Sequence, residues 1–251
     1  MPVTPISPIR LSMWSGPRNI STALMRSFGN RNDCQAIDEP FYAYYLNETG
    51  LAHPMREEVI QSQPNDWETV AEALNGPVEG NKSLLYIKHM AQHMLPPINK
   101  DCFLEHVNCF LIRDPRLVIA SFAQKWDQIE ASTTGFPQQM ELFEYFSEHG
   151  KYSPVVIEGE DILKAPETML SHLCTTIGID FDPSMLAWEK GPRKEDGVWG
   201  SHWYSAVENS TGFQTYEKKS VILTREQEQL AGELQPIYEL LRKKKLVPSS
   251  T

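Results

Sequence analysis

Residues that could bind an anion stand near the N-terminus. Residues 12–22, Ser-Met-Trp-Ser-Gly-Pro-Arg-Asn-Ile-Ser-Thr, lie between a short apolar stretch and an amphipathic helix pattern. Where a strand gives way to a helix, the first backbone N–H groups of the helix are unpaired and its dipole attracts an anion. Arg18, Ser21 and Thr22 add a cation and two hydroxyl groups. This segment therefore predicts a phosphate-binding turn.

The turn differs from two common nucleotide-binding motifs. Triphosphate-binding loops carry Gly-x-x-x-x-Gly-Lys-Ser/Thr, in which the Lys reaches the phosphates, and this chain lacks the Gly-Lys pair. It also lacks the Gly-x-Gly-x-x-Gly fingerprint of dinucleotide-binding folds. The first absence disfavours a nucleotide-dependent kinase, and the second disfavours a dehydrogenase.

A second phosphate-binding candidate lies in the middle of the chain. Arg-Asp-Pro-Arg at 113–116 follows a predicted strand over 107–112, and the Pro favours a helix start directly after it. Ser121 stands eight positions after Arg113, on that predicted helix. Two such half-motifs, each between a strand and a helix, are more specific together than either is alone.

Together these motifs resemble those of sulfotransferases that use 3′-phosphoadenosine-5′-phosphosulfate (PAPS). Residues 17–22 are similar to the family's 5′-phosphosulfate loop, Pro-Lys/Arg-x-Gly-Thr/Ser-Thr, although Ile20 replaces its Gly. Arg113 and Ser121 resemble the pair that holds the 3′-phosphate. Residues 191–200 resemble the family's closing Arg-Lys-Gly loop, with Glu195 in place of its Gly. The resemblance implies donor binding by Gly16, Pro17, Arg18, Asn19, Ile20, Ser21, Thr22, Arg113, Ser121, Arg193 and Lys194.

The resemblance also implies a chemistry and its residues. In the family an acceptor hydroxyl attacks in line, PAPS leaves as adenosine 3′,5′-bisphosphate, and no metal is needed. Arg18 would stabilise the leaving group, Glu39 would be the base, and Lys88 would contact the transferring group. Cytosolic members carry a catalytic His two positions after this Lys, where this chain has Met90. His89 and His93 are therefore alternative bases, because imidazole titrates near neutral pH.

Aromatic residues near these positions predict the acceptor pocket. Some follow Glu39 directly, and others flank the closing-loop candidate. Such rings suit an apolar acceptor, or they could surround a quaternary ammonium group, which ring faces attract. The predicted pocket residues are Phe41, Tyr42, His93, Trp199 and Trp203.

The order of predicted elements indicates an α/β fold with three layers, similar to P-loop NTPases. A central, mainly parallel sheet of about five strands would be flanked by helices, with ligands at the carboxyl ends of the strands. Arg18, Glu39, Lys88 and Arg113 each follow a predicted strand, so we expect them to face one crevice. The predicted strands cover 9–14, 35–37, 84–87, 107–112 and 154–157; the helices cover 19–28, 117–126, 138–146, 166–177 and 225–245; residues 191–213 read as irregular.

Length and composition indicate the number of domains, the cellular location and the kinds of partner. The 251 residues show no linker, so we expect one domain over residues 1–251. No stretch reaches the roughly 18 apolar residues that cross a bilayer, and the N-terminus resembles no secretory signal, which together favour a cytoplasmic protein without a membrane partner. A net charge of −10 disfavours nucleic acid as a partner. Four scattered cysteines lack metal-site spacing and favour reduced core residues.

The preferred interpretation is a PAPS-dependent sulfotransferase that acts on the hydroxyl of a small-molecule acceptor, with Glu39 as base. Two alternatives stay open: a P-loop nucleotide-dependent kinase, and a non-catalytic nucleotide-binding domain. The second is suggested by Ile20, Met90 and Glu195, which depart from the family pattern. The sequence leaves the acceptor and the oligomeric state undetermined, with a homodimer as one option.

Overall fold

The computed structural model describes residues 8–126 and 129–247, and this part is built on one parallel sheet. The strand order is β2-β3-β1-β4-β5, and every neighbouring pair is parallel. The predicted α/β fold with a parallel five-stranded sheet flanked by helices is therefore confirmed. The strands are β1 (Ile9–Ser15), β2 (Cys34–Asp38), β3 (Leu84–Met90), β4 (Val107–Ile112) and β5 (Val155–Glu158).

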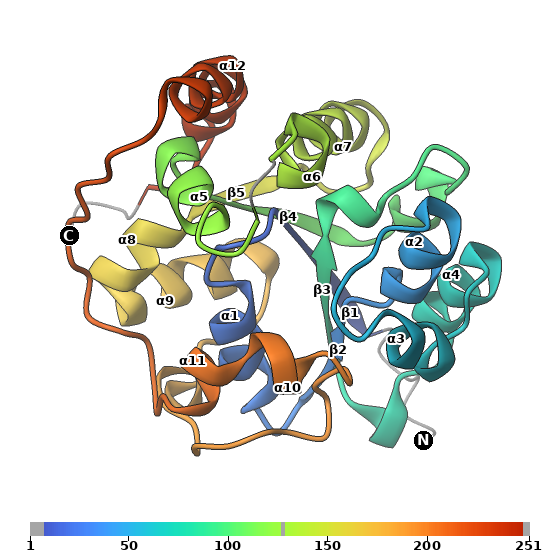
Figure 1. Ribbon diagram of the computed structural model, residues 1–251. Coiled ribbons are helices and arrows are strands. Elements are labelled where there is room, and N and C mark those ends of the chain that lie inside the picture. Colours follow the sequence, from blue (N-terminus) through green and yellow to red (C-terminus); the bar gives the residue numbers. More distant parts are fainter. Residues whose placement is uncertain (1–7, 127–128, 248–251) are drawn as a thin grey trace, which may run out of the picture.

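Helices cover both faces of this sheet (Figure 1). Those on the one side include α1, α8 and α9, while α7 and α12 lie on the other. The helices are α1 (Ser21–Gly29), α2 (Tyr42–Thr49), α3 (Arg56–Ser62), α4 (Trp67–Asn75), α5 (Pro115–Phe122), α6 (Ala131–Thr134), α7 (Phe136–His149), α8 (Gly159–Lys164), α9 (Pro166–Ile177), α10 (Gly200–Trp203), α11 (Ser205–Glu208) and α12 (Arg225–Arg242). Short 3₁₀ turns span Glu79–Asn81, Ala91–His93, Lys100–Phe103 and Pro183–Leu186.

The sheet separates the interior of the protein into two hydrophobic cores, one on each face. Successive side chains of a strand point to opposite faces, and the sheet is buried on both. In β1, Leu11 and Met13 belong to the core that includes residues of α1, α8 and α9, whereas Trp14 belongs to the core that includes residues of α7 and α12. The strands therefore read as nearly continuous apolar runs, and two helical layers enclose the sheet.

Local signals set the helix ends. Asp114 caps α5 by accepting from the backbone N–H of Arg116 at 2.8 Å, with Pro115 in the first turn, so α5 begins two residues before its predicted start. Thr224 and Gln227 form a capping box at the start of α12. The predicted end of α12 at 245 is wrong by three residues, because the chain leaves the helix and Lys245 bridges to β5.

Several helices of the structure were not predicted from the sequence. Helices α2, α3 and α4 fill residues 42–75, for which no element was predicted, and residues 191–213 hold the short helices α10 and α11 rather than irregular chain alone. These helices are four to nine residues long, so each carries little periodic signal. Within the described ranges no helix is long and apolar enough to span a membrane.

Candidate active site

A cavity of about 890 Å³ opens at the carboxyl ends of the strands. Its lining includes Arg18 after β1, Glu39 after β2, Lys88 on β3 and Arg113 after β4. The sheet order explains why they meet: β1 has β3 on one side and β4 on the other, so the ends of these strands share one edge. The expected convergence of these four residues on one crevice is what the structure shows.

One wall of the cavity is the turn between β1 and α1. Ile20 precedes the helix and supplies no side-chain cap, and no described group accepts from the backbone N–H groups of residues 21–23. These donors, at the positive end of α1, suit an anion. The backbone bends at Arg18, which has a left-handed φ of 61°, whereas Ile20 has an ordinary φ of −90°. The turn therefore needs no glycine at position 20.

The two predicted phosphate-binding motifs are in direct contact. Nε of Arg18 donates to Oγ of Ser121 at 2.9 Å, and the Arg113 guanidinium donates to the carbonyl oxygen of Arg18. Asn19 ties the same turn to β4 by donating to the carbonyl oxygen of Leu111 at 3.1 Å. Burial lowers the pKa of both guanidinium groups, but arginine stays charged at neutral pH. Two cations and a hydroxyl group thus face one part of the cavity.

Strand register creates the second cluster. Asp38 and Lys88 are directly opposed on β2 and β3, and Nζ of Lys88 lies 2.8 Å from Oδ1 of Asp38. In an extended strand Glu39 would point to the other face. Its left-handed φ of 40° breaks this alternation, so Glu39 also accepts from Nζ of Lys88. Such a backbone conformation is costly for a residue other than glycine and is often found at functional sites.

Two carboxylates therefore share one buried ammonium group. Burial raises the pKa of Glu39, the Lys88 charge opposes that rise, and the Asp38 charge adds to it. For Lys88 burial alone would lower the pKa, but the charges of Asp38 and Glu39 outweigh it and the pKa is raised. Oε1 of Glu39 contacts Lys88, and no described residue donates to its Oε2. Glu39 thus presents a carboxylate oxygen with a raised proton affinity beside the cavity.

Aromatic side chains line another part of the cavity. The His93 ring lies between the rings of Tyr42 and Tyr45, with centroids 4.7 and 4.6 Å away. Burial holds the pKa of His93 well below its usual value, so its imidazole is neutral. Nδ1 of His53 lies 2.9 Å from the Tyr42 hydroxyl. Tyr45, one of the aromatic residues that follow Glu39, lines the cavity, as do His53 and Trp126, which were not predicted because no short motif marks such residues as pocket walls.

Comparison with known proteins decides the family. Residues 9–244 match the sulfotransferase domain family. The chain belongs to this family. Two solved structures share the fold: a sulfotransferase domain from the curacin biosynthetic pathway (16% identity, TM-score 0.56, covering 92% of this chain and 99% of that one) and a sulfotransferase from Alicyclobacillus acidocaldarius (11% identity, TM-score 0.55, covering 96% and 98%).

Two relatives from Arabidopsis thaliana carry a different name. Branched-chain-amino-acid aminotransferase-like proteins 1 and 2 are 34% and 32% identical to this sulfotransferase domain over 230 residues, or 91% of the chain. The chain spans about two fifths of the length of these relatives. Their name therefore describes proteins much longer than the part that matches.

His89 does not face the cavity of the sulfotransferase domain, which corrects its prediction as a catalytic residue. It follows Lys88 on β3, so its side chain points to the opposite face of the sheet. There its ring stacks on Trp14, the residue opposite it on β1, with centroids 4.0 Å apart. The predicted strand ended at Ile87, so His89 was placed after the strand and not within it, where side chains alternate between the two faces of the sheet. Phe41, predicted in the acceptor pocket, packs in the same opposite core.

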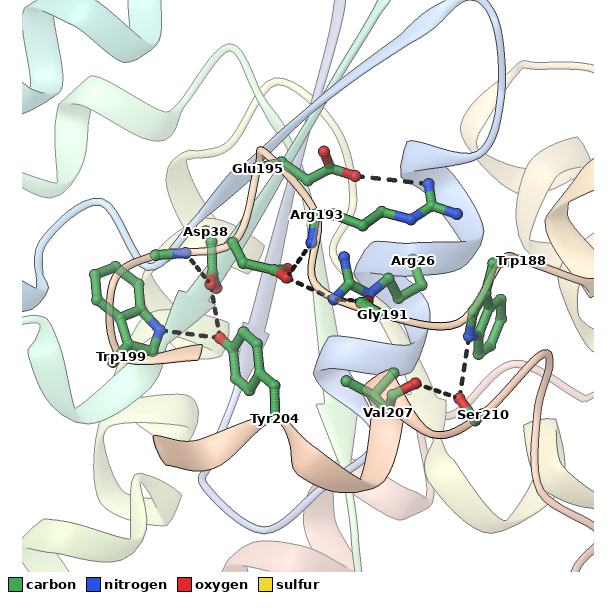
Figure 2. A network of polar contacts seen from close by, with 12 residues as sticks. Arg26, Asp38, Trp188, Gly191, Arg193, Glu195, Trp199, Tyr204, Val207 and Ser210 are labelled. Atoms are coloured by element: carbon green, nitrogen blue, oxygen red, sulfur yellow. Dashed lines mark hydrogen bonds and ion pairs between the residues drawn. The ribbon is translucent and has the colours of Figure 1, made fainter. Parts of the chain in front are cut away.

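The predicted closing-loop residues are also placed elsewhere. Arg193 pairs with Glu195 at 3.7 Å (Figure 2) and donates to Oδ1 of Asn30, just after α1, at 3.2 Å. Lys194 is exposed. Neither residue lines the cavity, so their predicted contact with the 3′-phosphate is not supported.

Gly16 lies outside the cavity lining as well, and its small size serves packing. A Cβ at Gly16 would come within 2.3 Å of the Thr134 carbonyl oxygen, so only glycine lets α6 approach the turn. Among the described residues, no group of three His, Cys, Asp or Glu side chains could hold a metal ion. The predicted absence of a metal stays a prediction.

The remaining predicted residues do line the cavity. They are residues 17–22, Arg113, Ser121, Tyr42, His93, Trp199 and Trp203. Lys88 and Glu39 contribute to the same lining. The roles of all these residues stay predictions.

Proposed function

We propose that this domain transfers a sulfuryl group from PAPS to the hydroxyl of a small-molecule acceptor and releases adenosine 3′,5′-bisphosphate. The observation that carries the proposal is the arrangement of two separate anion-binding groups and a Lys–carboxylate cluster around one cavity. The anion-binding groups are the turn at Arg18 and the pair Arg113 and Ser121. The cluster is Lys88 with Asp38 and Glu39.

The donor end suits a nucleotide with phosphates at both the 5′ and 3′ positions. The free N–H groups of α1 and Arg18 would hold the 5′-phosphosulfate, and Arg113 with Ser121 would hold the 3′-phosphate. A triphosphate-dependent kinase would need a Lys in the turn that reaches the β- and γ-phosphates. That position holds no Lys, which counts against the kinase alternative.

The transfer would proceed in line. The acceptor oxygen forms a bond to sulfur while the bond between sulfur and the bridging phosphate oxygen breaks, and the negative charge moves to that bridging oxygen. Arg18 and the start of α1 would stabilise this charge, and preorganised donors of this kind are each worth roughly 3 kcal/mol. The hydroxyl proton would pass to Oε2 of Glu39, which has no donor among the described residues.

His93 is the alternative base. It lines the cavity and no described group bonds to its Nδ1. Its ring is held between two tyrosine rings, and its proton affinity is low, because burial holds its pKa well below the usual value. Glu39 is preferred because burial raises its pKa and because its carboxylate lies against Lys88.

A calorimetric titration and a transfer assay test the proposal in two steps. Adenosine 3′,5′-bisphosphate should bind, and ATP with Mg²⁺ should bind much more weakly; the reverse order would favour the kinase. Radiolabelled PAPS is then offered with phenols, aliphatic alcohols, sugars and choline, and one class should be sulfated. Tight binding of the bisphosphate without transfer to any class would favour the non-catalytic alternative. One domain over residues 1–251, the cytoplasmic location and the homodimer stay predictions.

A further inference from the structure

One segment, residues 188–210, contacts α1 and reaches Asp38, a member of the Lys–carboxylate cluster (Figure 2). It is anchored on α1 by Asp196, whose carboxylate lies 2.6 Å from the Arg26 guanidinium, and both side chains are almost fully buried. The backbone N–H of Gly197 then donates to Oδ2 of Asp38 at 3.1 Å. Two consecutive residues in the middle of the segment, Asp196 and Gly197, therefore tie it to α1 and to the end of β2.

The Tyr204 hydroxyl lies at the centre of this contact. It is 3.0 Å from Nε1 of Trp199, 2.8 Å from Nζ of Lys88 and 2.7 Å from Oδ2 of Asp38. An indole N–H and an ammonium group can only donate, and a hydroxyl has two acceptor sites and one proton. The hydroxyl therefore accepts from Trp199 and Lys88, and its proton goes to Asp38. Burial and the neighbouring carboxylates raise the pKa of Tyr204, so this proton is retained.

The two neighbouring carboxylates consequently have different surroundings. Asp38 receives three hydrogen bonds, from Lys88, Tyr204 and the N–H of Gly197. Glu39 shares Lys88 but has its second oxygen beside the cavity. Donors around a carboxylate stabilise its charged form. Asp38 is thus equipped to hold Lys88 in place, and Glu39 is equipped to exchange a proton.

We propose that Tyr204 is a positioning residue for sulfuryl transfer, held in place by Trp199, and that it keeps Asp38 and Glu39 ionised together around Lys88. This inference rests on the proposed function, in which Glu39 is the base. Because Trp199 and Tyr204 also line the cavity, the same segment shapes the acceptor end and sets the charge state of the base.

The segment offers a matched control. Trp188 also donates its Nε1–H to a hydroxyl oxygen, that of Ser210, at 3.0 Å. This bond belongs to the same segment but does not touch the Lys–carboxylate cluster (Figure 2). Trp188→Phe and Trp199→Phe therefore remove the same chemical group from the same segment, and only the second should affect the cluster.

The test follows the protonation of the two carboxyl groups directly and needs neither the sulfuryl donor nor an acceptor substrate. Carboxyl ¹³C signals of Asp38 and Glu39 are assigned with Asp38→Asn and Glu39→Gln and are titrated by NMR. Tyr204→Phe removes a donor to the doubly ionised pair, so the pair should take up its first proton about one pH unit higher than in the wild type. Trp199→Phe should cause a smaller rise, and Trp188→Phe should leave the titration unchanged. An unchanged titration in Tyr204→Phe, with its near-ultraviolet circular dichroism preserved, would overturn the inference.

Activity separates this inference from the proposed function. With an acceptor found in the PAPS assay, Tyr204→Phe should lower kcat about tenfold or more, move the acid limb of the kcat profile to higher pH and leave bisphosphate affinity within twofold. A normal kcat profile in Tyr204→Phe, beside an inactive Glu39→Gln, would overturn the positioning role alone. A fully active Glu39→Gln would overturn the assignment of the base, and the positioning role with it.

Discussion

Nε of Arg18 donates a hydrogen bond to Oγ of Ser121 at 2.9 Å, which joins the turn after β1 to helix α5. The two residues come from the two motifs that resemble a donor site, and β1 and β4, which lead into them, are neighbours in the sheet. The bond uses one acceptor site of the Ser121 hydroxyl, leaves the hydroxyl proton available to a ligand, and holds the Arg18 side chain beside the cavity. A bound nucleotide would meet a prearranged site, which lowers the entropic cost of binding.

Removing the second cation should weaken donor binding. Arg113→Ala deletes the guanidinium predicted to hold the 3′-phosphate, and charge-assisted hydrogen bonds are worth about 1.5–3 kcal/mol, so bisphosphate affinity should fall about 10- to 100-fold. Arg116→Ala is the control, because Arg116 belongs to the same motif but pairs with Glu228 on the surface. Calorimetry measures both variants. Equal losses in the two would remove Arg113 from the nucleotide site.

Replacing the proposed base should abolish transfer with little effect on donor binding. Glu39→Gln keeps the shape of the side chain but cannot accept the hydroxyl proton, so kcat should fall about 10²- to 10⁴-fold, the usual contribution of a general base. Bisphosphate affinity should change no more than a few-fold. Glu130→Gln, which alters another cavity-lining glutamate, is the control in the PAPS assay. Unchanged turnover in Glu39→Gln would shift the role to His93.

The stability of the protein should fall as the pH drops below 6.5. Burial lowers the pKa of His106 to about 4, while Ser12 and Asn75 bond to its two ring nitrogens. The unfolded chain takes up a proton near pH 6.5 and the folded protein does not, so acid favours unfolding. His106 should account for about 2 kcal/mol of the loss between pH 7 and pH 5. Urea unfolding at both pH values measures it.

The control for this pH effect is His106→Gln. Its free energy of unfolding should be lower at both pH values, but the difference between pH 7 and pH 5 should be smaller by that same amount. His89 and His93 contribute in the same direction, because burial also lowers the pKa of each well below its usual value. A variant with the full wild-type pH difference would show that His106 is protonated in the folded protein.

The anchor of the 188–210 segment should be far more important to stability than a surface ion pair. Asp196→Ala leaves the Arg26 charge buried without its partner, and breaking such a pair costs about 3–5 kcal/mol. Glu228→Ala breaks the exposed pair with Arg116, which should cost under about 1 kcal/mol. Urea unfolding of the two variants gives the comparison. Similar small losses would mean that the segment is held mainly by its apolar contacts.

The elements predicted most accurately are those whose own residues show a clear apolar pattern and a clear end. The run at 107–112 and the helix at 166–177 were predicted with their observed bounds, because each combines a periodic apolar pattern with a clear stop. Helices α2 to α4 were missed since each is short and helps enclose the sheet through a few buried residues. The prediction of His89 as a catalytic residue was wrong because the end of β3 was placed three residues early. Within the full strand, His89 points to the face of the sheet opposite Lys88.

The sequence by itself determined the residue types of the donor site and the family resemblance, because those motifs are short and lie at strand ends. Only the tertiary structure decided how these side chains contact one another and which predicted residues, such as His89 and Arg193, lie outside the cavity. Strand register placed Asp38 opposite Lys88, and the bend at Glu39 brought a second carboxylate to the same ammonium group. Tyr204, which is distant in sequence, contacts the same cluster through Asp38. Such contacts depend on pairing between distant segments, and no local pattern encodes them.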